Sequence, residues 1–157
     1  MRTMQKIAMM LAFLASGIAL AAVPGRVVPR LAPPQAQEPV PAFHSQVPKS
    51  DLPATMSPEL FVDVAVQNAY IIAARIKKTL YQQPCYCHCD QSQGHGSLLD
   101  CYVSRHASGC DICMREAFYA YEQLAKGKTA AQIRDAIIKG DWASVDMTKY
   151  QKRLPAK

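Results

Sequence analysis

Cysteine is absent from this 157-residue chain before Cys85, and clustered basic residues and long strand patterns are lacking throughout. The net charge is +6, but the basic residues are scattered and no aromatic-interleaved basic stripe occurs, which argues against nucleic-acid binding. No alternation of apolar and polar residues is long enough to indicate a sheet. Nothing suggests a hydrolase or a nucleotide site, so binding or scaffolding is favoured over catalysis, although catalysis stays open.

The N-terminal residues indicate export. A polar start with two basic residues precedes an apolar run, and the small-x-small tripeptide ALA stands at its end. The run is shorter than the ~20 residues that a spanning helix needs, which is typical of a secretory signal. We therefore expect a signal peptide at residues 1–21 and a bacterial periplasmic or cell-surface location. The alternative is an uncleaved N-terminal anchor, which would be the only membrane contact of the chain.

Proline dominates the next segment. Residues 22–56 hold eight of the eleven prolines and show no apolar periodicity. Proline lacks a backbone donor and favours extended geometry, so this segment is predicted to be a disordered spacer. The lipid-modified cysteine of bacterial lipoproteins is missing, because no cysteine lies in this part of the chain.

A helical pattern covers residues 57–142, and residues 143–157 are predicted to be a tail. The pattern opens with a serine, a proline and a glutamate at 57–59, which together form a helix start. Apolar residues then recur at three- and four-residue steps to about Tyr81. The proline at position 84 ends this first predicted helix.

Three further helices are predicted after the cysteine-rich stretch. The second runs from 97 to about 106, the third from 110 or 111 to 127, and the fourth from 129 to 140. A weak capping box opens the second and a clearer one opens the fourth, while glycines close the third and fourth. The expected fold is all-α, a small bundle of about four helices with a cysteine-rich loop between the first two.

The six cysteines permit a disulfide framework. Disulfides persist outside the cytoplasm, and an even number of cysteines is what such a framework requires. Many pairings are possible and the sequence does not distinguish them. A disulfide-stapled structural or interaction domain without metal is therefore one interpretation.

The stretch PCYCHCD places Cys85, Cys87 and Cys89 at alternate positions. Neighbours in a C-x-C pair are poorly placed to form a disulfide with each other, but they are well placed to direct two sulfurs at one ion. Downstream, Cys110 and Cys113 lie three apart at a predicted helix start, so they share a face. The helix N-terminus lowers the pKa of a thiol and favours the thiolate that binds metal.

The two pairs together offer four thiolates, from Cys87, Cys89, Cys110 and Cys113. This donor set suits copper(I), zinc or an iron–sulfur cluster. Cys85 and Cys101 remain to expand a cluster or to pair with each other. The candidate additional ligands are His88, His95 and His106, of which His88 ranks first because it lies between two cysteines.

PCYCHC followed by GHGSLLDCYVSRHASGCDICMREA resembles bacterial secreted proteins and lipoproteins named for a PCYCGC motif. The resemblance covers roughly residues 57–140, and His88 stands where the motif has glycine. It implies an exported location and a shared constellation but no activity, since the family has no assigned function. The constellation comprises Cys85, Cys87, Cys89, His95, Cys101, His106, Cys110 and Cys113.

Three functions remain open. Exported soft-metal binding, with copper(I) ahead of zinc and a metal donor or acceptor protein as partner, is favoured because a disulfide staple needs no interleaved histidines. The disulfide-stapled domain is the second. The third is a thiol–disulfide redox protein that uses Cys110 and Cys113. A thioredoxin fold is disfavoured because no βαβ pattern surrounds this pair, and a c-type haem because Met114 follows Cys113.

Overall fold

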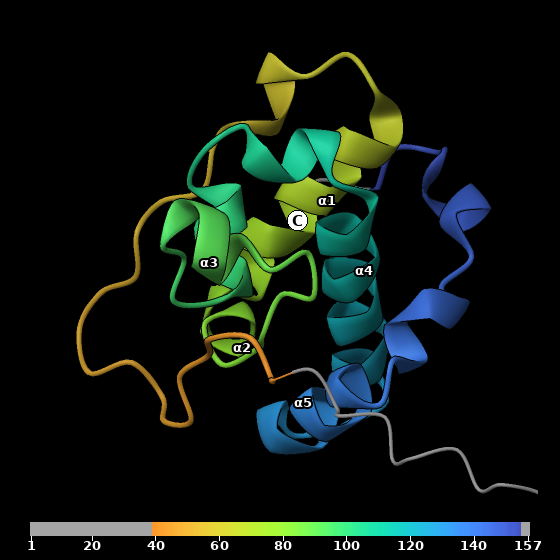
Figure 1. Ribbon diagram of the computed structural model, residues 1–157. Helices are drawn as coiled ribbons and strands as arrows, with labels where there is room; N and C mark the ends of the chain where they lie inside the picture. The colour runs from red at the N-terminus through yellow and green to blue at the C-terminus, as the bar shows by residue number, and fades with distance from the viewer. Residues whose placement is uncertain (1–38, 155–157) are drawn as a thin grey trace, which may run out of the picture. The chain divides into compact units, whose positions relative to one another are not determined.

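Two helices, α1 (Val64–Arg75) and α4 (Asp111–Ala125), pack against each other at the centre of the molecule (Figure 1). The computed structural model describes residues 39–154, which lie within the compact unit Gln37–Lys157. Over this range the chain forms five α-helices joined by 3-10 turns and contains no strand, so the all-α prediction is confirmed. The predicted signal peptide and residues 22–38 of the predicted spacer lie outside the described residues.

The first predicted helix, 57–81, is interrupted in the structure. A 3-10 turn, η1 (Pro58–Leu60), is followed by extended backbone at Phe61 before α1 begins. The helix starts where the Asp63 carboxylate accepts a hydrogen bond from the Val66 amide at 3.0 Å, and this acidic cap replaces the predicted serine cap. The helix also breaks at Ile76, so that a short α2 (Lys77–Leu80) leads into the cysteine-rich loop.

The second predicted helix, 97–106, is instead a pair of 3-10 turns, η2 (Leu98–Tyr102) and η3 (His106–Gly109). The expected capping box does not form, because the Asp100 carboxylate accepts from the Gly96 amide at 2.7 Å. The buried Ser97 hydroxyl has no hydrogen-bond partner among the described residues. The apolar side chains of η2 are nevertheless fully buried, so packing against the core stabilises this segment in addition to its 3-10 hydrogen bonds.

The last two predicted helices are present. The capping box at α5 (Ala130–Ile138) is complete: the Gln132 amide donates to the Thr129 hydroxyl at 3.2 Å, and the Thr129 amide donates to the Gln132 side chain at 3.0 Å. Two 3-10 turns follow, η4 (Asp141–Ser144) and η5 (Met147–Tyr150). No helix in residues 39–154 is long and apolar enough to cross a membrane.

The cysteine-rich loop is anchored at both ends by Gln83. Its buried side-chain amide donates to the carbonyls of Thr79 at 3.0 Å and Ala130 at 3.2 Å. Its own carbonyl accepts from the Leu98 amide at 2.9 Å. The loop contains one short helix that was not predicted, α3 (Cys89–Gln93). The rest of it is irregular, as predicted for the segment between the proline stop and the glycine pair.

Residues 39–56 lie against the domain, although they belong to the predicted spacer. The His44 ring stacks on the Tyr81 ring with centroids 3.9 Å apart, and the Met56 amide donates to the Tyr102 carbonyl at 2.9 Å. Because these contacts tie the segment to buried parts of the fold, the domain begins before Ser57, where the sequence placed its start. Proline-rich composition shows only that the segment lacks regular structure, and it does not exclude packing.

The predicted C-terminal tail also packs on the domain as far as residue 154. The side-chain amide of buried Asn68 donates to the carbonyls of Tyr150 at 2.7 Å and Lys152 at 2.9 Å, and its oxygen accepts from the Leu154 amide at 2.9 Å. The Tyr150 ring stacks on Phe118 with centroids 3.6 Å apart. One polar residue of α1 therefore holds a segment that carries little helical signal of its own.

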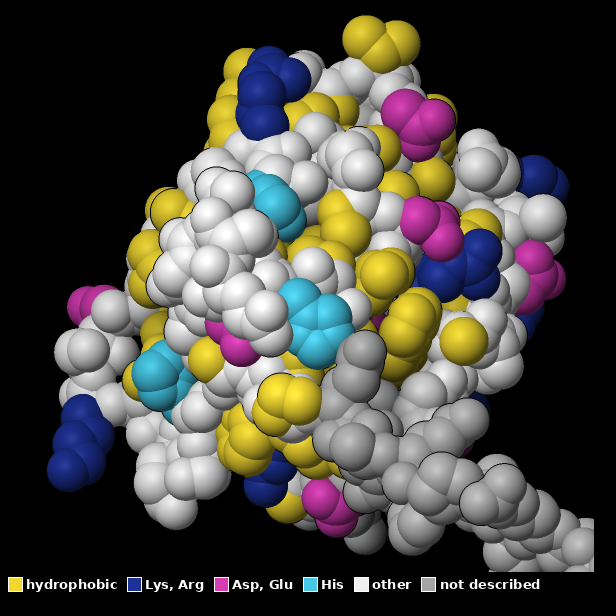
Figure 2. Space-filling model, viewed as in Figure 1, with side chains coloured by type: hydrophobic (Ala, Val, Ile, Leu, Met, Phe, Trp, Pro, Cys, Tyr) yellow, Lys and Arg dark blue, Asp and Glu magenta, His cyan; other side chains and the backbone are white. Residues whose placement is uncertain are grey.

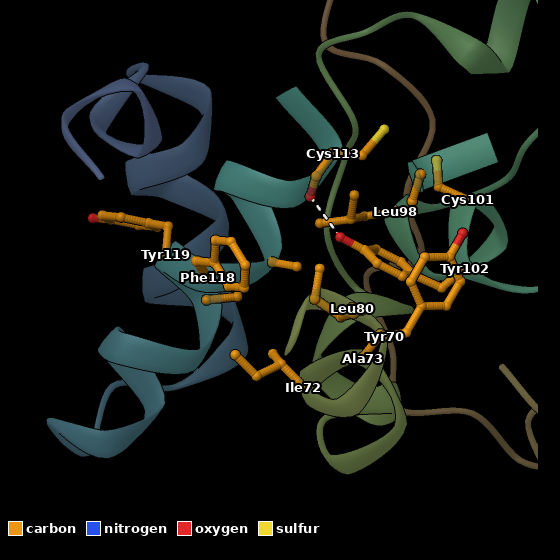
Figure 3. Close-up of a cluster of buried hydrophobic side chains, with 14 of the residues drawn as sticks. Tyr70, Ile72, Ala73, Leu80, Leu98, Cys101, Tyr102, Cys113, Phe118 and Tyr119 are labelled. Atoms are coloured by element: carbon orange, nitrogen blue, oxygen red, sulfur yellow. Dashed lines mark hydrogen bonds between the residues drawn. The ribbon is translucent and has the colours of Figure 1, made fainter. Parts of the chain in front are cut away.

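Two tyrosines connect the core to the cysteines (Figure 3). The Tyr70 and Tyr102 rings meet edge to face at 5.1 Å, and the Tyr102 hydroxyl donates to the Cys113 carbonyl at 2.8 Å. In Figure 3, Cys101 and Cys113 lie beside these rings at one end of the buried cluster. The core thus continues without a break into the sulfur-rich region.

Candidate metal centre

Separate parts of the chain deliver the cysteine sulfurs to one place. Cys85 and Cys87 come from the loop after the proline stop, Cys89 begins α3, Cys101 lies in η2, and Cys113 lies in the first turn of α4. All of these side chains except Cys87 are buried, and Cys87 is half-buried. The centre therefore exists only in the folded chain, at the junction of the loop with α4 and η2.

Four of these sulfurs form the first quartet: Cys85, Cys87, Cys101 and Cys113. The Cys85 sulfur lies 3.4 Å from those of Cys87 and Cys113, and the latter two are 3.5 Å apart. The Cys101 sulfur lies 3.9 Å from that of Cys85. Four sulfurs placed tetrahedrally at about 2.3 Å from one ion would be about 3.8 Å apart. The observed spacing therefore fits four-coordinate binding of a single ion.

A second quartet overlaps the first and comprises Cys87, Cys89, Cys101 and His106. The sulfurs of Cys89 and Cys101 are 3.2 Å apart, and His106 Nε2 lies 3.8 Å from the Cys87 sulfur. The donor atoms of each quartet lie within 4.8 Å of one another. The centre thus offers two sets of ligands that share the sulfurs of Cys87 and Cys101.

His95 lies beside the shared sulfur of Cys101. Its Nδ1 is 3.3 Å from that sulfur, and its ring meets the His106 ring edge to face at 5.1 Å. Both imidazoles are half-buried. His95 is thus close enough to donate a hydrogen bond to a Cys101 thiolate, an outer-shell role common beside metal-bound ligands.

The six cysteines, all within the described residues, are free thiols in this structure. The shortest sulfur–sulfur distance is 3.2 Å, between Cys89 and Cys101, whereas a disulfide bond measures about 2.05 Å. Thiols are weak hydrogen-bond donors, so hydrogen bonding alone gives little reason to gather five of them. A shared ion gives such a reason.

The observed grouping differs from the four-thiolate set expected from the sequence. Cys110 belongs to neither quartet, and its sulfur accepts from the Cys113 amide at 3.4 Å, which makes Cys110 the N-cap of α4. Cys85 and Cys101, expected to be left over, are members instead. The C-x2-C spacing predicts a shared helix face, but Cys110 precedes the helix in extended backbone and its sulfur caps the helix.

Neighbouring thiols divide the sulfurs into two kinds. Hydrogen bonding from Cys113, aided by Cys85, lowers the pKa of Cys101 to about 3. Hydrogen bonding from Cys101 and other thiols also holds the pKa of Cys87 below its usual range. The pKa of Cys85, Cys89 and Cys113 is raised, first through hydrogen bonding with Cys101. The two shared sulfurs are therefore those that carry thiolate charge most readily.

Glu116 of α4 lies fully buried beneath the loop. Its carboxyl accepts a hydrogen bond from the Tyr86 amide at 2.8 Å, which fixes the backbone between Cys85 and Cys87. Burial raises the pKa of Glu116 to about 8, although the Tyr86 hydrogen bond opposes the shift. Burial therefore favours the neutral form of the carboxyl, which adds no negative charge to the sulfurs above it.

Glu116→Gln is expected to change how the stability of the metal-free, reduced protein depends on pH. Between pH 4.5 and about 8 the unfolded chain loses this proton while the folded protein keeps it, so the free energy of unfolding falls as pH rises. Glutamine keeps the acceptor for Tyr86 but does not ionise. Denaturant unfolding measures the free energy of unfolding of both proteins. Between pH 4.5 and pH 8, the value for the variant should rise relative to that of the wild type by on the order of 4 kcal/mol.

The matched control is Glu122→Gln, on the same helix, where the half-buried carboxylate accepts from the Tyr150 hydroxyl. This variant makes the same substitution on the same helix at a half-buried position, so the difference between its pH slope and that of Glu116→Gln isolates the effect of burial at Glu116. Equal slopes in wild type and Glu116→Gln would show that the buried carboxyl ionises normally.

Helices, free thiols and interleaved histidines define a small, cysteine-rich helical protein with a candidate metal centre. The model of the family described as "Protein of unknown function with PCYCGC motif" matches residues 49–143, and the chain belongs to this family. Neither the curated proteins nor the solved structures yielded a match to the chain.

The structure explains the glycine of the family motif. His88 stands at that position and adopts a left-handed conformation, with φ +54°, the only positive φ of a non-glycine residue in 39–154. Glycine adopts this conformation without strain, whereas other residues are strained there by roughly 1–2 kcal/mol. His88 also lies outside both quartets, so its first rank among the histidines follows from sequence proximity and not from the observed grouping.

His88→Gly is therefore expected to stabilise the reduced, metal-free protein by about 0.5–1 kcal/mol, because relief of strain exceeds the added flexibility of the unfolded chain. Denaturant unfolding measures the change. His88→Ala is the control: it removes the imidazole but keeps the strained backbone, so it should give no gain. Equal stabilisation by both variants would contradict the strain argument.

Proposed function

We propose that this protein binds copper(I) in the thiol-rich centre and serves in its transfer or storage outside the cytoplasm. The observation that supports this most is the first quartet, in which four sulfurs from separate segments lie within 4.8 Å of one another without a disulfide. Such an arrangement has the dimensions of a metal-ligand set. The sequence of residues 1–21 supports the exported location.

The chemistry of the donors favours a soft ion. Sulfur and imidazole nitrogen surround the centre, and thiolates select copper(I), zinc or iron–sulfur clusters over hard cations. Iron–sulfur clusters attach their thiolates to different irons and so require wider spacing than one quartet provides. A structural zinc site closes with four ligands, whereas this centre holds further donors in contact. The surplus of soft donors favours copper(I), which can pass from ligand to ligand.

The arrangement also suggests where an ion enters. Of the quartet members, Cys87 and His106 are half-buried and the others are buried, and the neighbouring His95 is also half-buried. Figure 2 shows histidine side chains at the surface of the viewed face. A metal donor or acceptor protein would meet the centre on the half-buried side and exchange ligands with Cys87 first.

Anaerobic titration of the reduced protein with copper(I), against a competing chelator, tests this function. We expect uptake of at least one ion with an affinity that withstands the chelator, and weaker retention of zinc in a parallel titration. If zinc displaces copper(I) from the loaded protein, the centre is a zinc site. If the reduced protein retains neither ion, the thiols serve another purpose.

A further inference from the structure

We infer that the centre holds two copper(I) ions bridged by the sulfurs of Cys87 and Cys101. This inference rests on the proposed function and extends it from binding to the form of the bound metal. One ion would lie among the first quartet, and the second among Cys87, Cys89, Cys101 and His106. Neither ion would bind all six ligands of the two quartets.

The geometry of the donors supports two positions. Two ligands that each lie about 2.3 Å from one ion are at most about 4.6 Å apart. The six donor atoms form two compact groups, each within 4.8 Å, rather than one group. Each group has two members of its own: Cys85 and Cys113 in the first, Cys89 and His106 in the second. The shared sulfurs lie between these pairs.

The formal charges favour the second ion. A second monovalent ion adds one positive charge, and its own sulfur ligand, Cys89, adds one negative charge when it binds as thiolate, while an imidazole ligand such as His106 binds metal in its uncharged form. Ion and thiolate cancel, so the net charge of the centre does not grow. This balance matters because Cys89 and Cys101 are at most 1% exposed, and uncompensated charge at such depth is strongly unfavourable.

His95 suits a bridging role for Cys101. A bridging sulfur donates to two ions and benefits from a hydrogen bond that holds its orientation. In the tautomer that carries its proton on Nδ1, His95 supplies that bond across 3.3 Å. Cys110 lies outside both quartets.

Native mass spectrometry of the reduced whole chain, titrated anaerobically with copper(I), tests the inference. The wild type should bind two ions, and the double variant Cys89→Ser/His106→Ala, which lacks both ligands unique to the second group, should bind one. Cys110→Ser loses one thiol outside the groups and should still bind two. X-ray absorption should show copper–copper scattering in the wild type and not in the double variant.

The outcomes separate this inference from the proposed function. One ion in the wild type, or two without copper–copper scattering, would overturn the bridged pair but leave copper(I) binding intact. Three or more ions would also overturn it, since the centre would then be a larger cluster. No bound ion would overturn the proposed function itself. If the double variant fails to fold, the ion count and the copper–copper scattering of the wild type are sufficient to test the inference.

Discussion

Cys101→Ser is expected to weaken copper(I) binding roughly 100-fold or more, beyond the 10–100-fold loss typical when an outer-shell partner is removed. The reason is that the Cys101 sulfur belongs to both quartets and is fully buried. Serine is nearly the same size but offers a hard, neutral oxygen in place of a soft thiolate. Competition with a chelator for copper(I), under anaerobic conditions, measures the loss.

Cys110→Ser is the matched control because it makes the same chemical change outside both quartets. It should reduce affinity far less, and the serine hydroxyl can still cap α4. Helical circular dichroism of both variants checks that each remains folded. A larger loss with Cys110→Ser than with Cys101→Ser would favour the four-thiolate set predicted from sequence, Cys87, Cys89, Cys110 and Cys113, over the observed quartets.

Metal removal is expected to produce the second large effect. An ion bound only by the folded protein adds about 4 kcal/mol of stability when its free concentration is a thousandfold above its Kd. For a domain of this size such a gain raises the unfolding temperature by roughly 15 °C or more. Thermal unfolding of the reduced protein, with and without copper(I), should therefore differ by at least that amount.

The stabilisation has a structural basis that the variants can test. The ligands join the loop after α2 to η2 and α4, so a bound ion cross-links segments that are distant in sequence. Cys101→Ser should lose most of the copper-dependent gain, whereas Cys110→Ser should retain it. Identical unfolding temperatures for loaded and metal-free wild type would contradict a role for the ion in holding these segments.

Local sequence signals predict a helix correctly where no contact with another part of the fold competes with them. The capping box at Thr129 and Gln132 forms as expected, and α4 starts at Asp111. The segment at 97–106 fails because Asp100 bonds to the Gly96 amide rather than capping a helix, a competition that spacing does not reveal. The domain boundaries fail for a related reason: contacts such as His44 with Tyr81 depend on the tertiary fold.

The sequence predicts which cysteines and histidines belong to the candidate site, but it does not predict which of them form each quartet. The constellation of cysteines and histidines is visible in the sequence, and the structure brings most of it together. Cys101 was placed outside the core set because it has no cysteine within a short spacing, yet burial of η2 carries it to the centre. Its position in LLDCY, beside Leu98, Leu99 and Tyr102, which all become buried, is the one sequence feature that indicates burial of Cys101.

The mass of the whole protein, purified anaerobically from its own compartment and measured under native and denaturing conditions, tests the central claim most directly. The native mass counts bound ions, and the denatured mass counts the hydrogens on the six cysteines. We predict bound copper and six thiols that retain their hydrogens. A metal-free protein that lacks six hydrogens would show that the cysteines are disulfide staples, and that the sulfurs gather for cross-linking rather than for an ion.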